Sequence, residues 1–138
     1  MEAFGGRLAA AATSGGVFYL YGTLGAGKTT LARGFLHALG HSGRVKSPTY
    51  TLIESYQLGN LAVHHLDLYR VSDPEELEYL GLRDLIEPRS ACLVEWPERG
   101  AGHLPAPDLE LRIDIVDSST REIEYEARTD RGRRILGA

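Results

Sequence analysis

The sequence predicts an α/β domain with a mixed parallel and antiparallel sheet. Residues 17–21 form a short apolar run, followed after a glycine-rich loop by a segment with helical periodicity. A second apolar run, residues 91–95, ends in an acid and reads as another buried strand. Residues 50–66 and 109–127 alternate apolar with polar positions, which predicts antiparallel hairpins with one solvated face.

The first apolar run and the helix after it are the clearest elements. Residues 17–21 read VFYLY, and β-branched and aromatic side chains favour a strand. Residues 28–39 are predicted to form a helix, with Gly40 as its stop signal. The apolar side chains of this helix fall on one face: Leu31, Phe35, Leu36 and Leu39.

The middle of the chain carries turn and cap signals. Residues 50–66 are predicted to be a hairpin with a two-residue turn at Gly59-Asn60. Residues 72–75 read SDPE, the spacing of a capping box, and predict a short helix that Gly81 could end. Residues 82–87 are expected to add a further helical turn.

Length and composition indicate one globular domain. The chain has 138 residues, 43% of them hydrophobic and 25% charged, so we expect residues 1–138 to share one core. The start of the chain lacks a basic segment followed by a long apolar run, so a secretory signal is not expected. Neither is a membrane-spanning helix. The single cysteine, Cys92, cannot form an intramolecular disulfide and fits a reducing compartment, which predicts a cytoplasmic location and a thiol that serves only packing.

The charge balance limits the partners. The formal net charge is −4, so stable DNA binding and a general attraction to nucleic acid are not expected. Residues 128–138 are the local exception and are expected to be a basic C-terminal tail. Its cations are Arg128, Arg131, Arg133 and Arg134.

A phosphate-binding motif follows the first predicted strand. Residues 22–29 read GTLGAGKT and fit G-x-x-x-x-G-K-[ST] between a strand and a helix. Glycines let backbone N–H groups face phosphate oxygens at a helix N-terminus, while Lys28 reaches the β- and γ-phosphates and Thr29 can ligate Mg²⁺. The motif predicts a P-loop NTPase-like three-layer domain. Its expected nucleotide-binding residues are Gly25, Ala26, Gly27, Lys28, Thr29 and Thr30.

Two acids are candidates for the metal and for the attacking water. Glu95 ends the run ACLVE and Asp67 ends the run VHHLD, and a P-loop needs an acid at the end of a neighbouring strand. For each, the alternative is an ordinary surface acid just past a strand. No further Cys or His lies at ligand spacing from His64-His65, so a structural zinc site is not expected.

The segment SPTYT, residues 47–51, lies between the P-loop helix and the first hairpin. Its hydroxyls could sense the γ-phosphate as a switch, with Thr49 or Thr51 contacting Mg²⁺ or its water. The alternative is a Ser-Pro turn that leads into a strand.

The class of nucleotide enzyme is narrowed by what the sequence lacks. Asn60 is the only asparagine, so the guanine-reading motif N-K-x-D is missing, which argues against a GTPase. The chain also has little room for the lid and acceptor site of a small-molecule kinase. The residues therefore predict a minimal ATP-binding domain, with an ATPase favoured. A small-molecule kinase and a nucleotide-sensing module that does not hydrolyse ATP stay open.

Five segments taken together resemble the TsaE (YjeE) family, the ATPases of bacterial tRNA threonylcarbamoyladenosine biosynthesis. They are GTLGAGKTT (22–30), VKSPTYTL (45–52), HLDLYR (65–70), DPEELEYLG (73–81) and LVEWPE (93–98). The resemblance implies a P-loop fold and Mg²⁺-dependent ATP hydrolysis that supports the TsaB–TsaD complex, which modifies adenosine 37 of certain tRNAs. Contact with tRNA is expected only through that complex.

The resemblance also implies roles for individual residues. Lys28 and Thr29 match the P-loop lysine and the Mg²⁺-ligating threonine of the family. Asp67 and Glu95 match its HxDLYR and LVEWP acids, so both are expected to be catalytic and in the metal shell, with Glu95 ordering the attacking water. Thr49 matches the threonine of the SPT switch loop and is expected to contact the nucleotide. Family members usually start with a strand ahead of the helix expected at residues 1–12, so a shorter start is expected here.

Overall fold

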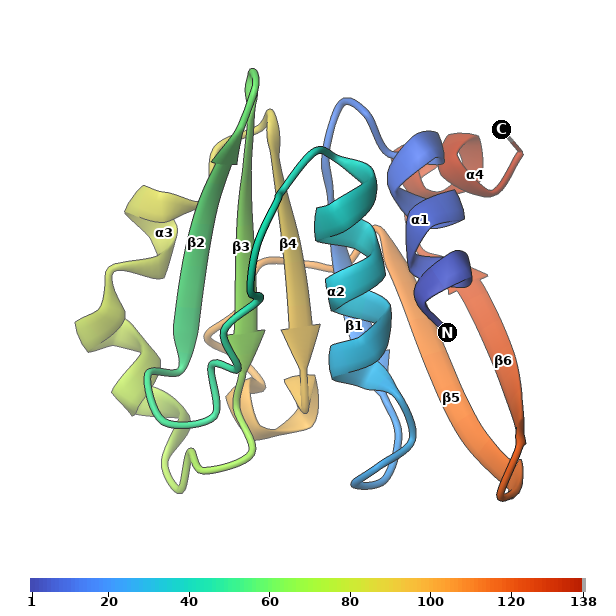
Figure 1. Ribbon diagram of the computed structural model, residues 1–138. Helices are drawn as coiled ribbons and strands as arrows, with labels where there is room; N and C mark the ends of the chain where they lie inside the picture. Colours follow the sequence, from blue (N-terminus) through green and yellow to red (C-terminus); the bar gives the residue numbers. More distant parts are fainter. Residues whose placement is uncertain (138) are drawn as a thin grey trace.

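The structure, a computed structural model, describes residues 1–137, apart from the side chains of Arg83 and Leu85. A six-stranded sheet with the order β2-β3-β4-β1-β5-β6 forms its centre (Figure 1). The four inner strands β3, β4, β1 and β5 are parallel, and the two edge strands pair antiparallel to their neighbours. The strands are β1 Gly16–Tyr21, β2 Ile53–Leu58, β3 Leu61–Asp67, β4 Ser90–Glu95, β5 Leu109–Asp117 and β6 Thr120–Ala127.

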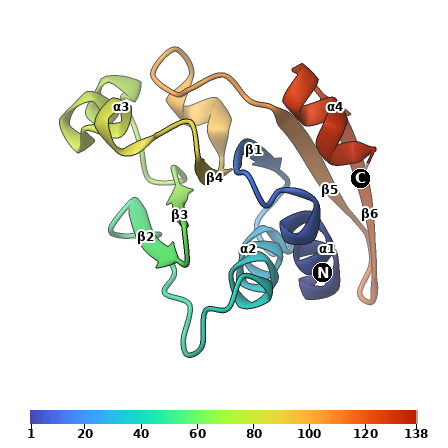
Figure 2. The ribbon, with the colours of Figure 1, turned by 90° about the horizontal axis from the view of Figure 1, so that it is seen from above.

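Helical elements lie on both faces of this sheet, which confirms the predicted mixed α/β fold. Helices α1 and α2 lie side by side on one face, and the segment with α3 lies on the other (Figure 2). The helical elements are α1 Glu2–Ala11, α2 Lys28–Ala38, α3 Leu82–Leu85, α4 Asp130–Leu136 and the 3₁₀ helices η1 Pro74–Leu80 and η2 Pro97–Gly100. The longest of these described helices, α2, has 11 residues, and none of them is suited to crossing a membrane.

The helices α1 and α2 approach each other closely because glycines face the contact. A Cβ atom on Gly5 would lie 2.1 Å from the backbone oxygen of Leu31, and one on Gly34 would lie 2.1 Å from that of Glu2. Beneath them, Phe18 of β1 and Phe35 of α2 are fully buried, with ring centroids 5.8 Å apart. This main core holds the P-loop helix firmly against the central strand.

A second apolar cluster fills the other face of the sheet. Val17, Cys92 and Val94 of the central strands pack there against Leu68 and Leu77. Cys92 is fully buried, and this burial raises the pKa of its thiol to about 12, in line with a packing residue. The same face of β5 and β6 is polar, as their alternation predicts.

The first hairpin has the predicted two-residue turn, because Leu58 pairs with Leu61. Its first strand starts at Ile53 and not at residue 50. The backbone turns first, as the N–H of Leu52 donates to the carbonyl of Pro48 at 2.7 Å and Leu52 has φ 68°.

The predicted capping box is wrong in its cap residue, and the short helix that follows it is a 3₁₀ helix. Asp73, not Ser72, is the N-cap of η1, and its side chain accepts from the backbone N–H of Glu75. Pro74 follows as the first helical residue, where its fixed φ suits a tight turn. Gly81 ends the helix in the left-handed conformation, as predicted, and α3 then starts at Leu82.

Most of the segment expected as a basic tail is folded. Thr129 caps α4 by accepting from the N–H of Gly132, and Ile135 of this helix is buried in the main core. Ala138 lies outside the described residues. The sequence signal for α4 is the cap residue Thr129 followed by Asp130 in the first turn, and the prediction did not use it.

Candidate nucleotide site

The predicted site residues come together at the carboxyl ends of the parallel strands. The loop of residues 22–27 joins β1 to α2, at the bottom of Figure 1. Asp67 and Glu95 are the last residues of β3 and β4, and they are direct cross-strand neighbours. Ligands of open α/β sheets bind at this edge, so the fold brings both predicted acids to the mouth of the P-loop.

The loop itself has the backbone of a phosphate cradle. Gly25 has φ 79° and Gly27 has φ 116°, conformations that other residues rarely adopt. A Cβ atom on Gly25 would meet nothing within 4 Å, so open space lies beside the loop. Gly27 is the N-cap of α2, which places the N–H groups of the first turn of that helix at the loop. These features suit an anion.

Lys28 is held within its own loop. Its ammonium donates to the carbonyl oxygens of Gly22 and of Thr23, the latter at 3.0 Å, and its residue is 5% exposed. Burial lowers the pKa of Lys28, whereas the charges of Glu95 and Asp67 act in the opposite direction. The ammonium thus has two carbonyl partners that phosphate oxygens could replace.

Glu95 links the P-loop helix to the sheet. The hydroxyl of Thr29 lies 3.1 Å from Oε1 and 3.0 Å from Oε2 of Glu95, which is 2% exposed. On its other side, Nε2 of His65 lies 2.6 Å from Oε2. The sequence did not predict this contact. The signal that could have found it is the spacing His65-x-Asp67, which puts both side chains on one sheet face.

Asp67 holds the segment predicted as a switch. Its Oδ2 accepts from the hydroxyl of Thr49 at 3.2 Å, and its Oδ1 accepts from the backbone N–H of Tyr69 at 3.1 Å. The hydroxyl of Thr49 is also 2.8 Å from that of Ser47. Thr51, the other predicted contact, is exposed. The turn predicted as the alternative is present too, so one segment both leads into β2 and reaches the site.

Trp96 covers the site from the end of β4. It has φ 57° and is the N-cap of η2. Its ring packs edge-on against Tyr69, with centroids 5.0 Å apart, and the guanidinium of Arg99 lies 5.8 Å from its centroid. A cavity of about 240 Å³ remains between this ring and the loop. Its lining residues are Leu24, Gly25, Ala26, Gly27, Lys28, Thr29, Thr30, Thr49, Asp67, Glu95 and Trp96.

The residues present fit a nucleotide triphosphate with Mg²⁺. The hydroxyl of Thr29 and the carboxylates of Asp67 and Glu95 supply hard oxygen donors, the type that Mg²⁺ prefers. The loop, the start of α2 and Lys28 supply the positive potential for the phosphates.

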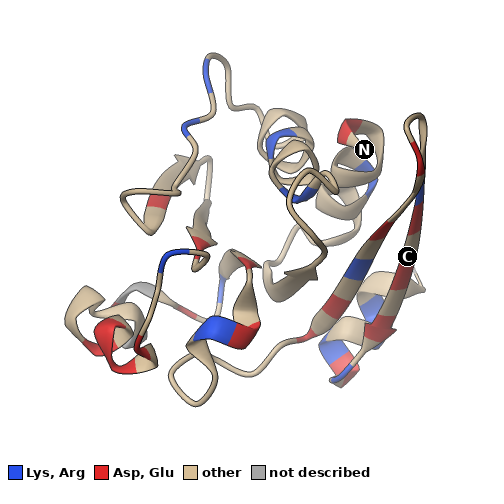
Figure 3. Cartoon of the chain, turned by 90° about the horizontal axis from the view of Figure 1, so that it is seen from below, with Lys and Arg blue, Asp and Glu red and all other residues tan. Residues whose placement is uncertain are grey.

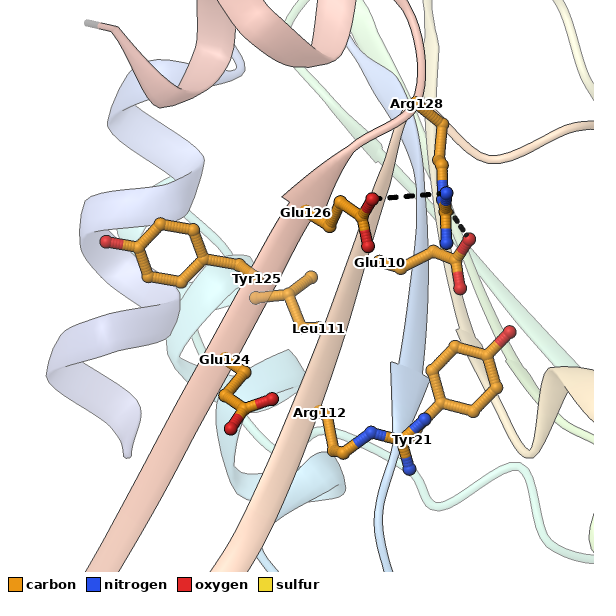
Figure 4. A pocket seen from close by; sticks show the side chains of 8 residues that line it. All are labelled: Tyr21, Glu110, Leu111, Arg112, Glu124, Tyr125, Glu126 and Arg128. Carbon is orange, nitrogen blue, oxygen red and sulfur yellow. Dashed lines mark hydrogen bonds and ion pairs between the residues drawn. The ribbon is translucent and has the colours of Figure 1, made fainter.

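A second pocket, of about 160 Å³, lies between β1, β5 and β6 (Figure 4). Three carboxylates and two arginines line it, so acids outnumber cations, and the guanidinium of Arg128 pairs with Glu110 at 2.6 Å and Glu126 at 3.2 Å. Acidic residues, with basic ones between them, also follow one another along both strands of the β5–β6 hairpin (Figure 3). This lining disfavours phosphate, in contrast to the P-loop cavity.

Two further arginines, Arg131 and Arg70, have partners within the chain. Arg131 donates to the carbonyls of Ser14 at 2.7 Å and Pro88 at 2.9 Å. Arg70 stacks on the ring of Tyr50, 4.3 Å from its centroid, and donates to the Tyr50 hydroxyl at 3.2 Å. The contacts of Arg131 fix α4 to the fold. The contact of Arg70 joins the switch segment to the end of β3.

The sequence is similar to those of known proteins. Residues 1–123 match the family described as "Threonylcarbamoyl adenosine biosynthesis protein TsaE". A Haemophilus influenzae protein named "tRNA threonylcarbamoyladenosine biosynthesis protein TsaE" is 52% identical over 120 residues, 87% of this chain and 75% of that protein. A Bacillus subtilis protein of the same name is 42% identical over 119 residues, 86% of this chain and 74% of that protein.

A solved structure has the same fold over nearly the whole chain. The crystal structure of Bacillus subtilis YdiB superposes with a TM-score of 0.82 and 34% sequence identity, covering 99% of this chain and 84% of YdiB.

Proposed function

Because the chain belongs to the TsaE family of tRNA threonylcarbamoyladenosine biosynthesis, we propose that it serves this pathway as a Mg²⁺-dependent ATPase. The observation that carries the proposal is the convergence at one sheet edge. The P-loop, the hydroxyl of Thr29 and the carboxylates of Asp67 and Glu95 meet around one cavity. ATP hydrolysis requires a loop that binds the phosphates, ligands for the metal ion, and a carboxylate that orients the attacking water.

Each residue has a distinct task in this proposal. The loop N–H groups and Lys28 bind the phosphates and stabilise the charge that develops on the β–γ bridge. Thr29 and Asp67 hold Mg²⁺, which when bound polarises the phosphates. Glu95 orients the attacking water and takes its proton, since its carboxylate lies at the end of a buried strand and next to Thr29. Thr49 links the switch segment to the metal shell through Asp67.

Turnover is expected to be slow for the chain alone. Two arginines near the site already have partners: Arg121 donates to the carbonyl of Ala26, and Arg99 stacks on Trp96 and Tyr69. These contacts occupy both of the described arginines beside the loop, and a P-loop ATPase whose transition state lacks an arginine depends on a partner to supply one. We assign this part to the TsaB–TsaD complex, with contact to tRNA only through that complex.

The acidic hairpin supports the indirect contact with tRNA. The polar face of β5 and β6 carries Glu110, Glu122, Glu124 and Glu126, and like charges repel the phosphate backbone. Direct binding of tRNA to this face is therefore not part of the proposal.

The test is reconstitution with TsaB, TsaD and tRNA. ATP hydrolysis and modified adenosine are measured with the chain, without it, and with the Lys28→Ala variant. We expect weak hydrolysis by the chain alone, stimulation by the partners, and multiple rounds of modification only with the unaltered chain. ATP binding without any turnover would indicate a nucleotide sensor instead, and transfer of the γ-phosphate to a metabolite would indicate a kinase.

A further inference from the structure

His65 is a fully buried histidine beneath the candidate nucleotide site. It lies on β3 two residues before Asp67, so strand alternation puts both side chains on the same face. Its side chain is 0% exposed, and its Nε2 lies 2.6 Å from Oε2 of Glu95 on the neighbouring strand. The other ring nitrogen, Nδ1, is buried with no hydrogen-bond partner in the described part of the chain.

Packing alone does not account for this side chain. A buried polar nitrogen without a partner destabilises the fold. Val63, two residues earlier on the same sheet face, is equally buried and has no polar atom to satisfy. What the imidazole adds over an aliphatic side chain is its contact with Glu95.

The two donors to Glu95 differ in their other tasks. An ionised carboxylate only accepts, so Nε2 of His65 donates the hydrogen of this contact. The hydroxyl of Thr29 also contacts Glu95, but it is the group proposed to ligate Mg²⁺. His65 is therefore the donor with no second role, and it sits on a strand whose backbone is fixed by β2 and β4.

We propose that His65 is a positioning residue that fixes the Glu95 carboxylate through Oε2. Oε1, which here contacts the Thr29 hydroxyl, would then be available to the attacking water once Thr29 takes its proposed role as a Mg²⁺ ligand. The inference rests on the ATPase function proposed above. Without this hydrogen bond, Glu95 would rotate away from the geometry that water activation needs, and small displacements of this kind reduce turnover strongly. Phosphate binding, which depends on the P-loop, would be unaffected.

The experiment compares three substitutions of His65 with a control. His65→Leu removes the donor. His65→Gln keeps an N–H donor near the former position of Nε2. In His65→Asn the side chain is one methylene shorter, so its amide does not reach Glu95. The control is His64→Leu on the opposite sheet face, where the ring contacts Ser55 at 2.8 Å. Affinity for Mg²⁺-ATP, the single-turnover hydrolysis rate with TsaB–TsaD, and thermal unfolding are measured for each.

We expect hydrolysis to fall about tenfold or more in His65→Leu and His65→Asn, with ATP affinity within about threefold of the unaltered chain. His65→Gln should recover most of the rate, and His64→Leu should hydrolyse normally. In a Glu95→Gln background, His65→Leu should cause no further loss, since both changes affect one contact. If the Leu variant does not fold, the Gln and Asn variants carry the same comparison.

Two results would overturn the inference while leaving the ATPase function in place. One is a rate in His65→Leu or His65→Asn within twofold of the unaltered chain. The other is a Gln variant as slow as the Asn variant, which would show a packing role. An unaltered chain that binds ATP but never hydrolyses it would instead overturn the proposed function, and this inference with it.

Discussion

The ammonium of Lys28 lies 4.3 Å from the centroid of the Trp96 ring. A cation over an indole face is attracted by the electrons of the ring, so its position affects the electrostatic environment of the indole. Lys28 is also the residue that must exchange carbonyl partners for phosphate oxygens when a nucleotide binds. Because Trp96 is the only tryptophan of the chain, its fluorescence reports on one place in the molecule.

Binding of Mg²⁺-ATP is therefore predicted to change the Trp96 emission in a saturable way. Lys28→Ala should remove the response, since it removes both the stacked cation and the phosphate ligand. The other lysine, Lys46, is exposed, so Lys46→Ala is the matched control and should respond like the unaltered chain. A saturable response that persists in Lys28→Ala would contradict the placement of this lysine at the phosphates.

Asp67→Asn is predicted to raise the Mg²⁺ concentration needed for half-maximal hydrolysis. The substitution removes the charge of a metal-shell carboxylate and disturbs its contact with Thr49, and changes in the metal shell typically cost about 10–100-fold in metal affinity. A Mg²⁺ titration at saturating ATP measures the shift. Asp84→Asn, an exposed acid on α3, is the control. Equal Mg²⁺ dependence in both variants would exclude Asp67 from the metal shell.

Arg121→Ala is predicted to weaken ATP binding from outside the cavity. The guanidinium of Arg121 joins the tip of the β5–β6 hairpin to the P-loop, donating to the carbonyls of Ala26 at 3.0 Å and Asp117 at 2.9 Å. A hydrogen bond from a charged donor contributes about 1.5 kcal/mol. If all of this energy orders the loop for binding, its loss lowers the affinity by roughly tenfold at most. Calorimetric titration tests this against Arg89→Ala, an exposed arginine before β4. No difference between the two would mean that the hairpin does not stabilise the loop.

Gly5→Ala is predicted to destabilise the fold, whereas Gly6→Ala is not. The new methyl at position 5 would lie 2.1 Å from the carbonyl oxygen of Leu31, while at position 6 the nearest atom is the Cβ of Ala38 at 3.6 Å. Overpacking typically costs about 1–3 kcal/mol, and alanine in place of a helical glycine contributes about 0.5–1 kcal/mol of stability. Chemical denaturation should separate the two variants. Similar unfolding midpoints would refute the close contact of α1 and α2.

Local sequence signals predicted the elements that surround the site. The apolar runs ending in Glu95 and Asp67, the glycines of the P-loop and the one-sided helix after it each have a local cause, namely alternation, turn chemistry or periodicity. Their side-by-side arrangement follows from one rule, that parallel strands end at the same edge. The structure places both acids there, next to the predicted loop.

The features that sequence reasoning missed depend on tertiary contacts. α4 is a short helix, and its Ile135 reaches the main core through contacts that span the whole chain. The contact between His65 and Glu95 joins residues on neighbouring strands, 30 positions apart in the sequence. The spacing His65-x-Asp67 puts the histidine on the face of the site, but only the register of β3 against β4 identifies Glu95 as its partner.

The most direct test of the account compares the unaltered chain with Glu95→Gln in the presence of TsaB–TsaD, measuring ATP binding and ATP hydrolysis in the same samples. The substituted glutamine side chain would keep the size of Glu95 but lose the ability to take a proton from water. We predict that both proteins bind ATP and that hydrolysis falls by about 10²–10⁴-fold in the variant, the usual contribution of a general base. Equal hydrolysis by both proteins would contradict the assignment of Glu95 as the residue that activates water.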